Sequence, residues 1–173
     1  MIKRSALAIA VTCFSLPVLS AGPQQPQSTA CPTTLAPHPP FVPPAPYPSA
    51  APNSRFWYGS DELWTALWVG GKWVAYANGE NGWVFQDKLV FWQRGFDWRK
   101  ETEPKLIITG KRLDGEAPTI AITHANAVFL PNRENAGMMT LISVPTTGCW
   151  EITAHYNGGD LSFVVAVESK THR

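Results

Sequence analysis

Apolar and polar residues alternate most regularly near the end of the chain, from Gly148 to Glu168. In the sequence GCWEITAHY the apolar residues from tryptophan onward occupy every second position, so they fall on one face of a strand. The sequence LSFVVAVE repeats this arrangement after a short interval. Alternation with a period of two is the pattern of a strand with one buried face. The intervening residues 157–160, Asn-Gly-Gly-Asp, are typical of a tight hairpin turn. We therefore predict a closing β-hairpin with these core residues: Trp150, Ile152, Ala154, Tyr156, Leu161, Phe163, Val165 and Val167.

Further apolar runs occur upstream, and turn-forming pairs such as Gly70-Gly71 and Asp114-Gly115 separate them. Many short strands with frequent turns are the signature of an immunoglobulin-like fold. We therefore predict one all-β domain over residues 54–168, an immunoglobulin-like antiparallel β-sandwich, followed by a C-terminal tail at 169–173. The runs predict strands, besides the closing hairpin, over 63–69, 72–76, 83–85, 88–92, 105–109, 119–123 and 138–144.

The segment 63–69 also carries features of a helix, because the acidic sequence at 60–62 before it resembles a helix N-cap. A strand is favoured, since Gly70-Gly71 between two apolar runs is the pattern of a tight hairpin. In that hairpin Trp68 would lie opposite Trp73.

The first residues have the pattern of an export signal. Lys3 and Arg4 precede a short apolar run, and small residues follow it at 20–22. The run is broken by Pro17 and is too short for a membrane span. We predict a signal peptide over 1–21, hence a periplasmic or extracellular protein with no membrane span. The alternative is a lipid anchor at Cys13, which the residues before that cysteine fit poorly.

Residues 22–53 differ sharply in composition from the rest. Eleven of the 31 residues from Gly22 to Pro52 are proline, which lacks the N–H donor that helices and sheets require. We predict an extended proline-rich linker here. Its simplest role is a spacer that holds the domain away from the envelope. The alternative is a ligand for an aromatic groove, because this arm carries Phe41 and Tyr47.

Signal removal would leave Cys31 and Cys149 as the only cysteines, in an oxidising compartment. We favour an intramolecular disulfide between them, and the alternative is that Cys31 pairs with another molecule. The intramolecular bond would close a loop of about 120 residues and contribute about 4–5 kcal/mol in the chain-entropy model.

Charge narrows the range of partners. The chain has 14 basic and 13 acidic residues, and loss of Lys3 and Arg4 leaves 12 basic against 13 acidic ones. No run of basic residues is present. A nearly neutral chain of this kind argues against binding to nucleic acid or to an anionic membrane surface. The expected partner is a protein or a glycan of the cell envelope.

Tryptophan is concentrated in one region, with seven of eight residues between Trp57 and Trp98. In the predicted hairpin, Trp64, Trp68 and Trp73 share one face, while the opposite face is apolar as well. An exposed tryptophan platform would stack on sugar rings or on a proline-rich peptide. These three residues are therefore the candidate binding residues. The ordinary alternative is that they fill the core.

Chemistry-bearing motifs are otherwise few. The segment 94–104 is a charged loop that we expect to be solvated. His124 and His155 have no neighbours at metal-ligand spacing, and no nucleophile elbow or phosphate loop occurs. We therefore predict no catalytic residue, no metal site and no cofactor, and expect that the protein is not an enzyme.

Three segments resemble a family of uncharacterised exported bacterial proteins: WYGSDELW at 57–64, ITGKRLD at 108–114 and PTTGCWEIT at 145–153. The resemblance covers residues 56–167 without the arm, and it implies an immunoglobulin-like fold and export. It transfers no activity and no catalytic residue. The expected function is structural or protein-interaction work in the cell envelope. A carbohydrate- or peptide-binding module is the alternative.

Overall fold

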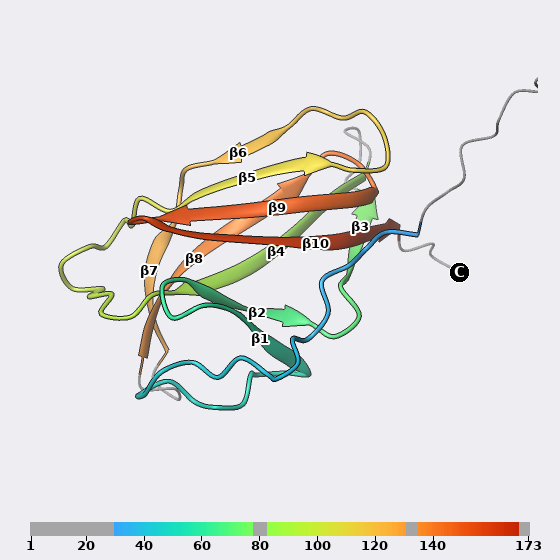
Figure 1. The fold of residues 1–173 in the computed structure, drawn as a ribbon. Helices are drawn as coiled ribbons and strands as arrows, with labels where there is room; N and C mark the ends of the chain where they lie inside the picture. Colours follow the sequence, from blue (N-terminus) through green and yellow to red (C-terminus); the bar gives the residue numbers. More distant parts are fainter. Residues whose placement is uncertain (1–29, 78–82, 131–134, 170–173) are drawn as a thin grey trace, which may run out of the picture.

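The part of the chain that the structure describes forms ten β-strands (Figure 1). The structure is a computed structural model and describes residues 30–77, 83–130 and 135–169. No helix occurs among these residues. The predicted signal peptide, the alternative lipid site at Cys13 and most of the predicted tail lie outside the described residues. The prediction of an all-β fold is confirmed, and two sheets consistent with a β-sandwich build it.

Two layers of strands enclose the core. One layer has the order β1-β2-β4-β8-β7, and the other β3-β10-β9-β5-β6. All pairs are antiparallel except β3 with β10, so the first layer is antiparallel and the second is mixed. The strands are β1 (Arg55–Gly59), β2 (Trp64–Trp68), β3 (Lys72–Ala77), β4 (Trp83–Trp92), β5 (Ile107–Arg112), β6 (Ile120–Ile122), β7 (Asn126–Leu130), β8 (Asn135–Val144), β9 (Gly148–Tyr156) and β10 (Gly159–Ser169).

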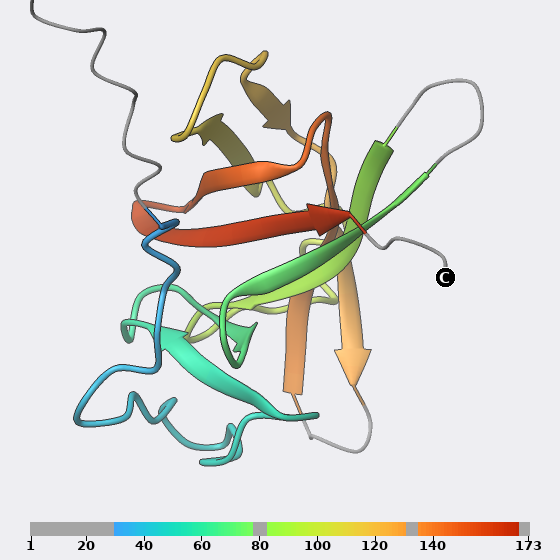
Figure 2. The ribbon, with the colours of Figure 1, turned by 90° about the vertical axis from the view of Figure 1, so that its right-hand side faces the viewer.

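The layers are joined at one corner, where the start of β4 pairs with the end of β3. Figure 2 shows β4, β7 and β8 running across the direction of β9 and β10. The alternating apolar residues of both layers therefore meet face to face. The largest fully buried side chains include Trp150, Ile152 and Phe163 from one layer and Phe91, Met138 and Ile142 from the other.

The closing hairpin forms as the alternation predicts. Tyr156 is the register partner of Gly159 across a two-residue turn. Asn157 and Gly158 both have positive φ, at 47° and 84°, as a type I′ turn requires. All eight residues predicted to face inward are buried.

The predicted hairpin over residues 63–76 is wrong. A turn is present, because the Gly71 N–H donates to the Trp68 carbonyl at 3.1 Å. However, β2 pairs with β1 and β4, whereas β3 pairs with β10 and β4. The chain thus passes from one layer to the other at Gly70-Gly71. A glycine turn between apolar runs is the same sequence signal in both cases, and only the tertiary partners decide between them.

Two strands, β1 and β7, were not predicted, and the runs 83–85 and 88–92 form the single strand β4. The strand assignment of residues 63–69, in contrast, is confirmed by β2.

The described part of the proline-rich arm, residues 30–53, packs against the domain instead of extending away from it. Cys31 is bonded to Cys149, which confirms the intramolecular disulfide. Thr34 exchanges hydrogen bonds with the backbone of Val164, each at 2.8–2.9 Å. The arm then continues beside β1 and β2 (Figure 1). The expectation of a spacer is therefore corrected for these residues.

Candidate functional site

The candidate tryptophan platform does not form, and the alternative that the rings fill the core is confirmed for Trp64 and Trp73. Trp64 and Trp73 are buried, with exposed fractions of 0% and 2%. Trp64 lies in a small aromatic cluster with Trp57 and Trp92. The arm covers this cluster, because the rings of Phe41 and Tyr47 lie 6.3 and 4.9 Å from that of Trp64. Both faces of the strand that carries Trp64 are apolar, and the arm covers the face that the main core does not.

Trp68 and Trp73 also take separate positions. Trp73 stacks on Phe85 in the main core at 4.5 Å. Trp68 is half-buried, and its Nε1 donates to Asp87 at 3.2 Å. The guanidinium of Arg55 lies 4.1 Å over the Trp68 ring. The structure therefore does not bring Trp64, Trp68 and Trp73 together on one open surface.

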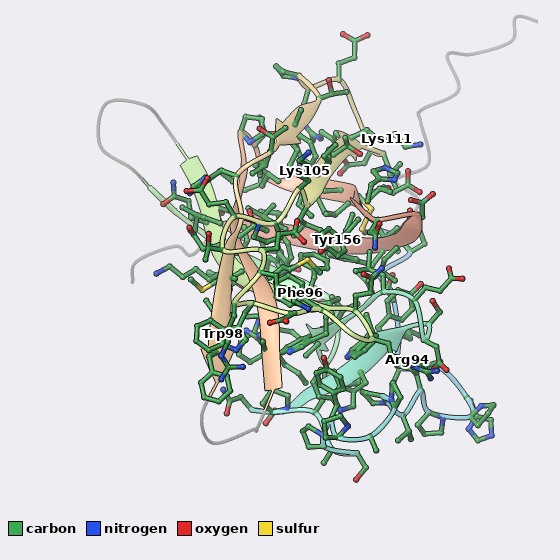
Figure 3. The ribbon with its side chains drawn as sticks, turned by 90° about the vertical axis from the view of Figure 1, so that its left-hand side faces the viewer. Arg94, Phe96, Trp98, Lys105, Lys111 and Tyr156 are labelled. Carbon is green, nitrogen blue, oxygen red and sulfur yellow. A yellow bond between two sulfur atoms is a disulfide. The ribbon has the colours of Figure 1, made fainter. Side chains whose placement is uncertain are left out.

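The loop that joins β4 to β5 lies at one end of the molecule (Figures 1 and 3). Polar and aromatic side chains line an open surface around this loop. Two hollows of about 440 and 380 Å³ border this loop, and Arg94 lines both of them. We call the two hollows together the Arg94 site. The larger one is the polar hollow and the other is the aromatic hollow.

The polar hollow collects side chains from three turns. Gln93 and Arg94 follow β4, Asp61 precedes β2, and Asn157 lies in the closing hairpin turn. Arg94 and Asp61 form an ion pair at 2.6 Å, with both side chains more than half exposed. The Asn157 amide reaches Gln93 Oε1 at 3.5 Å. Glu62, Gly158 and Gly159 complete the wall.

The aromatic hollow shares Arg94 with the polar hollow. Figure 3 shows Phe96 between Arg94 and Trp98 along the loop. Trp98 is half-buried and stacks on Phe129 of β7, with ring centres 5.6 Å apart and an angle of 25° between the rings. Phe129 is 47% exposed. Tyr47 of the arm lines the same hollow.

Internal contacts hold the loop in place. The Phe96 ring packs against Tyr156 at 6.1 Å. The Tyr156 hydroxyl donates to Glu101 at 2.5 Å, and the other Glu101 oxygen accepts from the Lys105 N–H. Burial and the Glu101 carboxylate together raise the pKa of Tyr156. These contacts attach the loop to β9 of the core sheet.

Charges around the loop largely compensate one another. The Arg99 N–H donates to Asp97, and this bond, with the nearby charges of Lys100 and Arg99, lowers the pKa of Asp97. The Lys100 ammonium lies 3.3 Å from the same carboxylate. The Arg99 guanidinium lies 4.8 Å from the centre of the Trp98 ring. The site is therefore polar with little net charge.

Among the described residues, no group of three His, Cys, Asp or Glu side chains is close enough to hold a metal ion. His155 pairs with Asp160 at 2.6 Å, and His124 lies near Asn126. No helix in the described part of the chain is long and apolar enough to cross a membrane.

Sequence reasoning named the charged loop but expected it to be solvated, and it overlooked Trp98 as a site residue. The available signal was the alternation of aromatic and charged residues in Arg-Gly-Phe-Asp-Trp-Arg at 94–99. Phe129 and Tyr47 could not have been associated with Trp98, because they are distant in the sequence.

Comparisons with protein-family models, with curated proteins and with solved structures gave no match to this chain. The resemblance to a family of exported bacterial proteins therefore stays a prediction.

Proposed function

We propose that this protein is an exported, non-enzymatic, immunoglobulin-like domain protein that binds a partner molecule of the cell envelope at the Arg94 site. The observation that carries the proposal is the partly exposed stack of Trp98, from the β4–β5 loop, on Phe129 of β7. This stack lies at the aromatic hollow. Tryptophan, tyrosine and arginine dominate the energetic centres of protein interfaces, and all three line the aromatic hollow.

Several features support the proposed fold identity and location. The two-layered all-β arrangement with a core between the sheets is compatible with an immunoglobulin-like sandwich. A disulfide between Cys31 and Cys149 is typical of proteins that mature in an oxidising compartment. The residues that resemble a signal peptide point to the same compartment. A periplasmic or extracellular protein agrees with all three.

The alternative function is a carbohydrate- or peptide-binding module. The polar hollow close to partly exposed aromatic rings supports this alternative. Such a module would use Trp98 and Phe129 in place of the buried Trp64 and Trp73. Both functions share one binding surface, so one set of variants tests them.

The test is retention of envelope material on the immobilised full chain. Proteins and glycans retained from a cell-envelope extract are compared between the unaltered protein and Trp98→Ala. The matched control is Trp68→Ala, which removes another half-buried tryptophan outside the site. We expect a molecule that is retained by the unaltered protein and the control but lost with Trp98→Ala. Equal retention by all three proteins, or no retained molecule, would contradict the proposal.

A further inference from the structure

We infer that the Arg94 site accepts a neutral oligosaccharide chain, with a sugar ring against the aromatic hollow and further hydroxyl groups bonded in the polar hollow. This inference rests on the proposed function, because it names the ligand class of the same site. The proposed function allows a protein, a peptide or a glycan as the partner, and this inference selects the glycan.

The aromatic hollow offers the contacts that a sugar face requires. Pyranose rings expose C–H groups on their faces, and these groups pack against the electron-rich face of an aromatic ring. Phe129 is 47% exposed, although it stacks on Trp98. Tyr47 and Phe96 lie in the wall of the same hollow. Ligand sites combine such apolar walls with a few fixed polar groups.

The polar hollow supplies those polar groups. Sugar hydroxyls both donate and accept hydrogen bonds, so their site needs donors and acceptors close together. Asp61 and Glu62 provide carboxylate acceptors, and Gln93 and Asn157 provide amides with both capacities. The Arg94 guanidinium has five N–H donors, and its ion pair with Asp61 is made through one nitrogen.

Charge compensation indicates a neutral ligand. Arg94 is paired with Asp61 at 2.6 Å, and Asp97 is paired with Lys100 at 3.3 Å. An anionic ligand would meet the carboxylates of Asp61 and Glu62 in the polar hollow. A cationic ligand would meet Arg94 and Arg99 at the aromatic hollow. Like charges brought together in this way disfavour both kinds of ligand.

The two hollows share one side chain in their walls, which indicates a chain of sugars. Arg94 lines both hollows, so a ligand that fills them passes over this residue. A single sugar would reach only one hollow and make only part of the contacts. The site is therefore expected to bind oligosaccharides more tightly than monosaccharides.

The test is calorimetric titration of the full chain with defined sugars. The neutral probes are hexasaccharides of β-1,4-linked glucose, of β-1,4-linked N-acetylglucosamine and of α-1,4-linked glucose, each compared with its monosaccharide. Hexagalacturonate is the anionic comparison. We expect that at least one neutral hexasaccharide binds, about ten-fold or more tighter than its monosaccharide and than hexagalacturonate.

Variants then locate the binding. Trp98→Ala and Arg94→Ala are each expected to weaken binding of that hexasaccharide by about ten-fold. Trp68→Ala and Lys111→Ala are the controls. Lys111 matches Arg94 in exposure and in having an ion pair, with Glu151 at 2.7 Å, and it lies far from Arg94 along this face (Figure 3). Thermal unfolding of each variant verifies that it is folded, and Phe129→Ala replaces any that is not.

Three results would overturn the inference: no binding of any neutral hexasaccharide, tighter binding of hexagalacturonate, or equal weakening by the control variants. If any one of these results is found while Trp98→Ala still abolishes retention of envelope material, only the ligand class is wrong. If that retention is also unaffected, the proposed function fails as well.

Discussion

At the scale of single residues, the tryptophans differ in how far the fold buries them. Trp64 is fully buried under the arm, whereas Trp98 lies half-buried at the open end of the molecule. The sequence assigned Trp64 to the candidate site because the predicted hairpin placed it on one face with Trp68 and Trp73, and Trp98 was overlooked because its loop was expected to be solvated. Burial decides whether a ring contributes to stability or remains available to a ligand.

The two positions should therefore respond differently to truncation. Trp64→Ala removes a large fully buried ring and is expected to lower the free energy of unfolding by about 3–5 kcal/mol. Trp98→Ala is expected to change it by about 1 kcal/mol or less, because the ring is partly solvated. Urea unfolding of both variants checks this, and similar losses for the two would contradict the burial assignment.

Tyr156 links stability to alkaline pH. Burial and the Glu101 carboxylate raise its pKa in the folded protein above the unfolded value of about 10. The folded state therefore holds the proton more tightly than the unfolded state. The resulting stability is fully present below pH 10 and is lost as the pH rises through the folded pKa.

We expect the free energy of unfolding to fall as the pH rises above about 10, and to fall less steeply in Tyr156→Phe. The variant should also lose about 1–3 kcal/mol at neutral pH with the hydrogen bond to Glu101. Urea unfolding between pH 7 and 11 measures both effects. Parallel pH profiles for the two proteins would refute the assignment to Tyr156.

At the scale of elements, the arm behaves as part of the fold. Its aromatic side chains cover Trp64, and Pro48 accepts a hydrogen bond from Trp57 Nε1 at 3.0 Å. Tyr47 extends from this contact to the aromatic hollow. The arm therefore stabilises the β1–β2 side of the molecule and shapes the candidate site.

The disulfide between the arm and β9 should contribute strongly to the free energy of unfolding. It joins residues 118 apart in the sequence, so it restricts the unfolded chain strongly. Replacing both Cys31 and Cys149 by Ser is expected to lower the free energy of unfolding by about 4–5 kcal/mol. Urea unfolding with and without a reductant measures this. The reductant should affect the unaltered protein and leave the double variant unchanged.

At the scale of the whole molecule, most tryptophan rings are inaccessible. Among the described side chains, Trp57, Trp64, Trp73, Trp92 and Trp150 are buried, and only Trp68 and Trp98 are half-buried. The candidate site is a whole-molecule feature too, because the arm, the β4–β5 loop, β7 and the closing turn all contribute to it.

Intrinsic fluorescence should report this distribution. We expect emission at short wavelength, with iodide quenching only a minor fraction of it, because buried indoles are shielded from water and anions. The double variant with Trp68→Phe and Trp98→Phe should show a smaller quenched fraction than the unaltered protein. Extensive quenching of the unaltered protein, or no change in the double variant, would contradict the described burial.

The sequence by itself determined the local elements. Alternation with a period of two specifies which side chains of β9 and β10 face the core, and the Asn157-Gly158 pair specifies their turn, because both depend only on neighbouring residues. The two cysteines outside the predicted signal peptide were enough to favour their pairing.

The tertiary structure decided everything that depends on distant partners. The turn at Gly70-Gly71 has the sequence of a hairpin but joins two layers, since β2 and β3 find other strands to pair with. The arm docks because its aromatic rings find an apolar cluster on the domain. The Arg94 site exists because Tyr47, Trp98 and Phe129, which are far apart in sequence, meet at one end of the fold. Such long-range contacts leave no periodic signal in the chain, so only the folded arrangement reveals them.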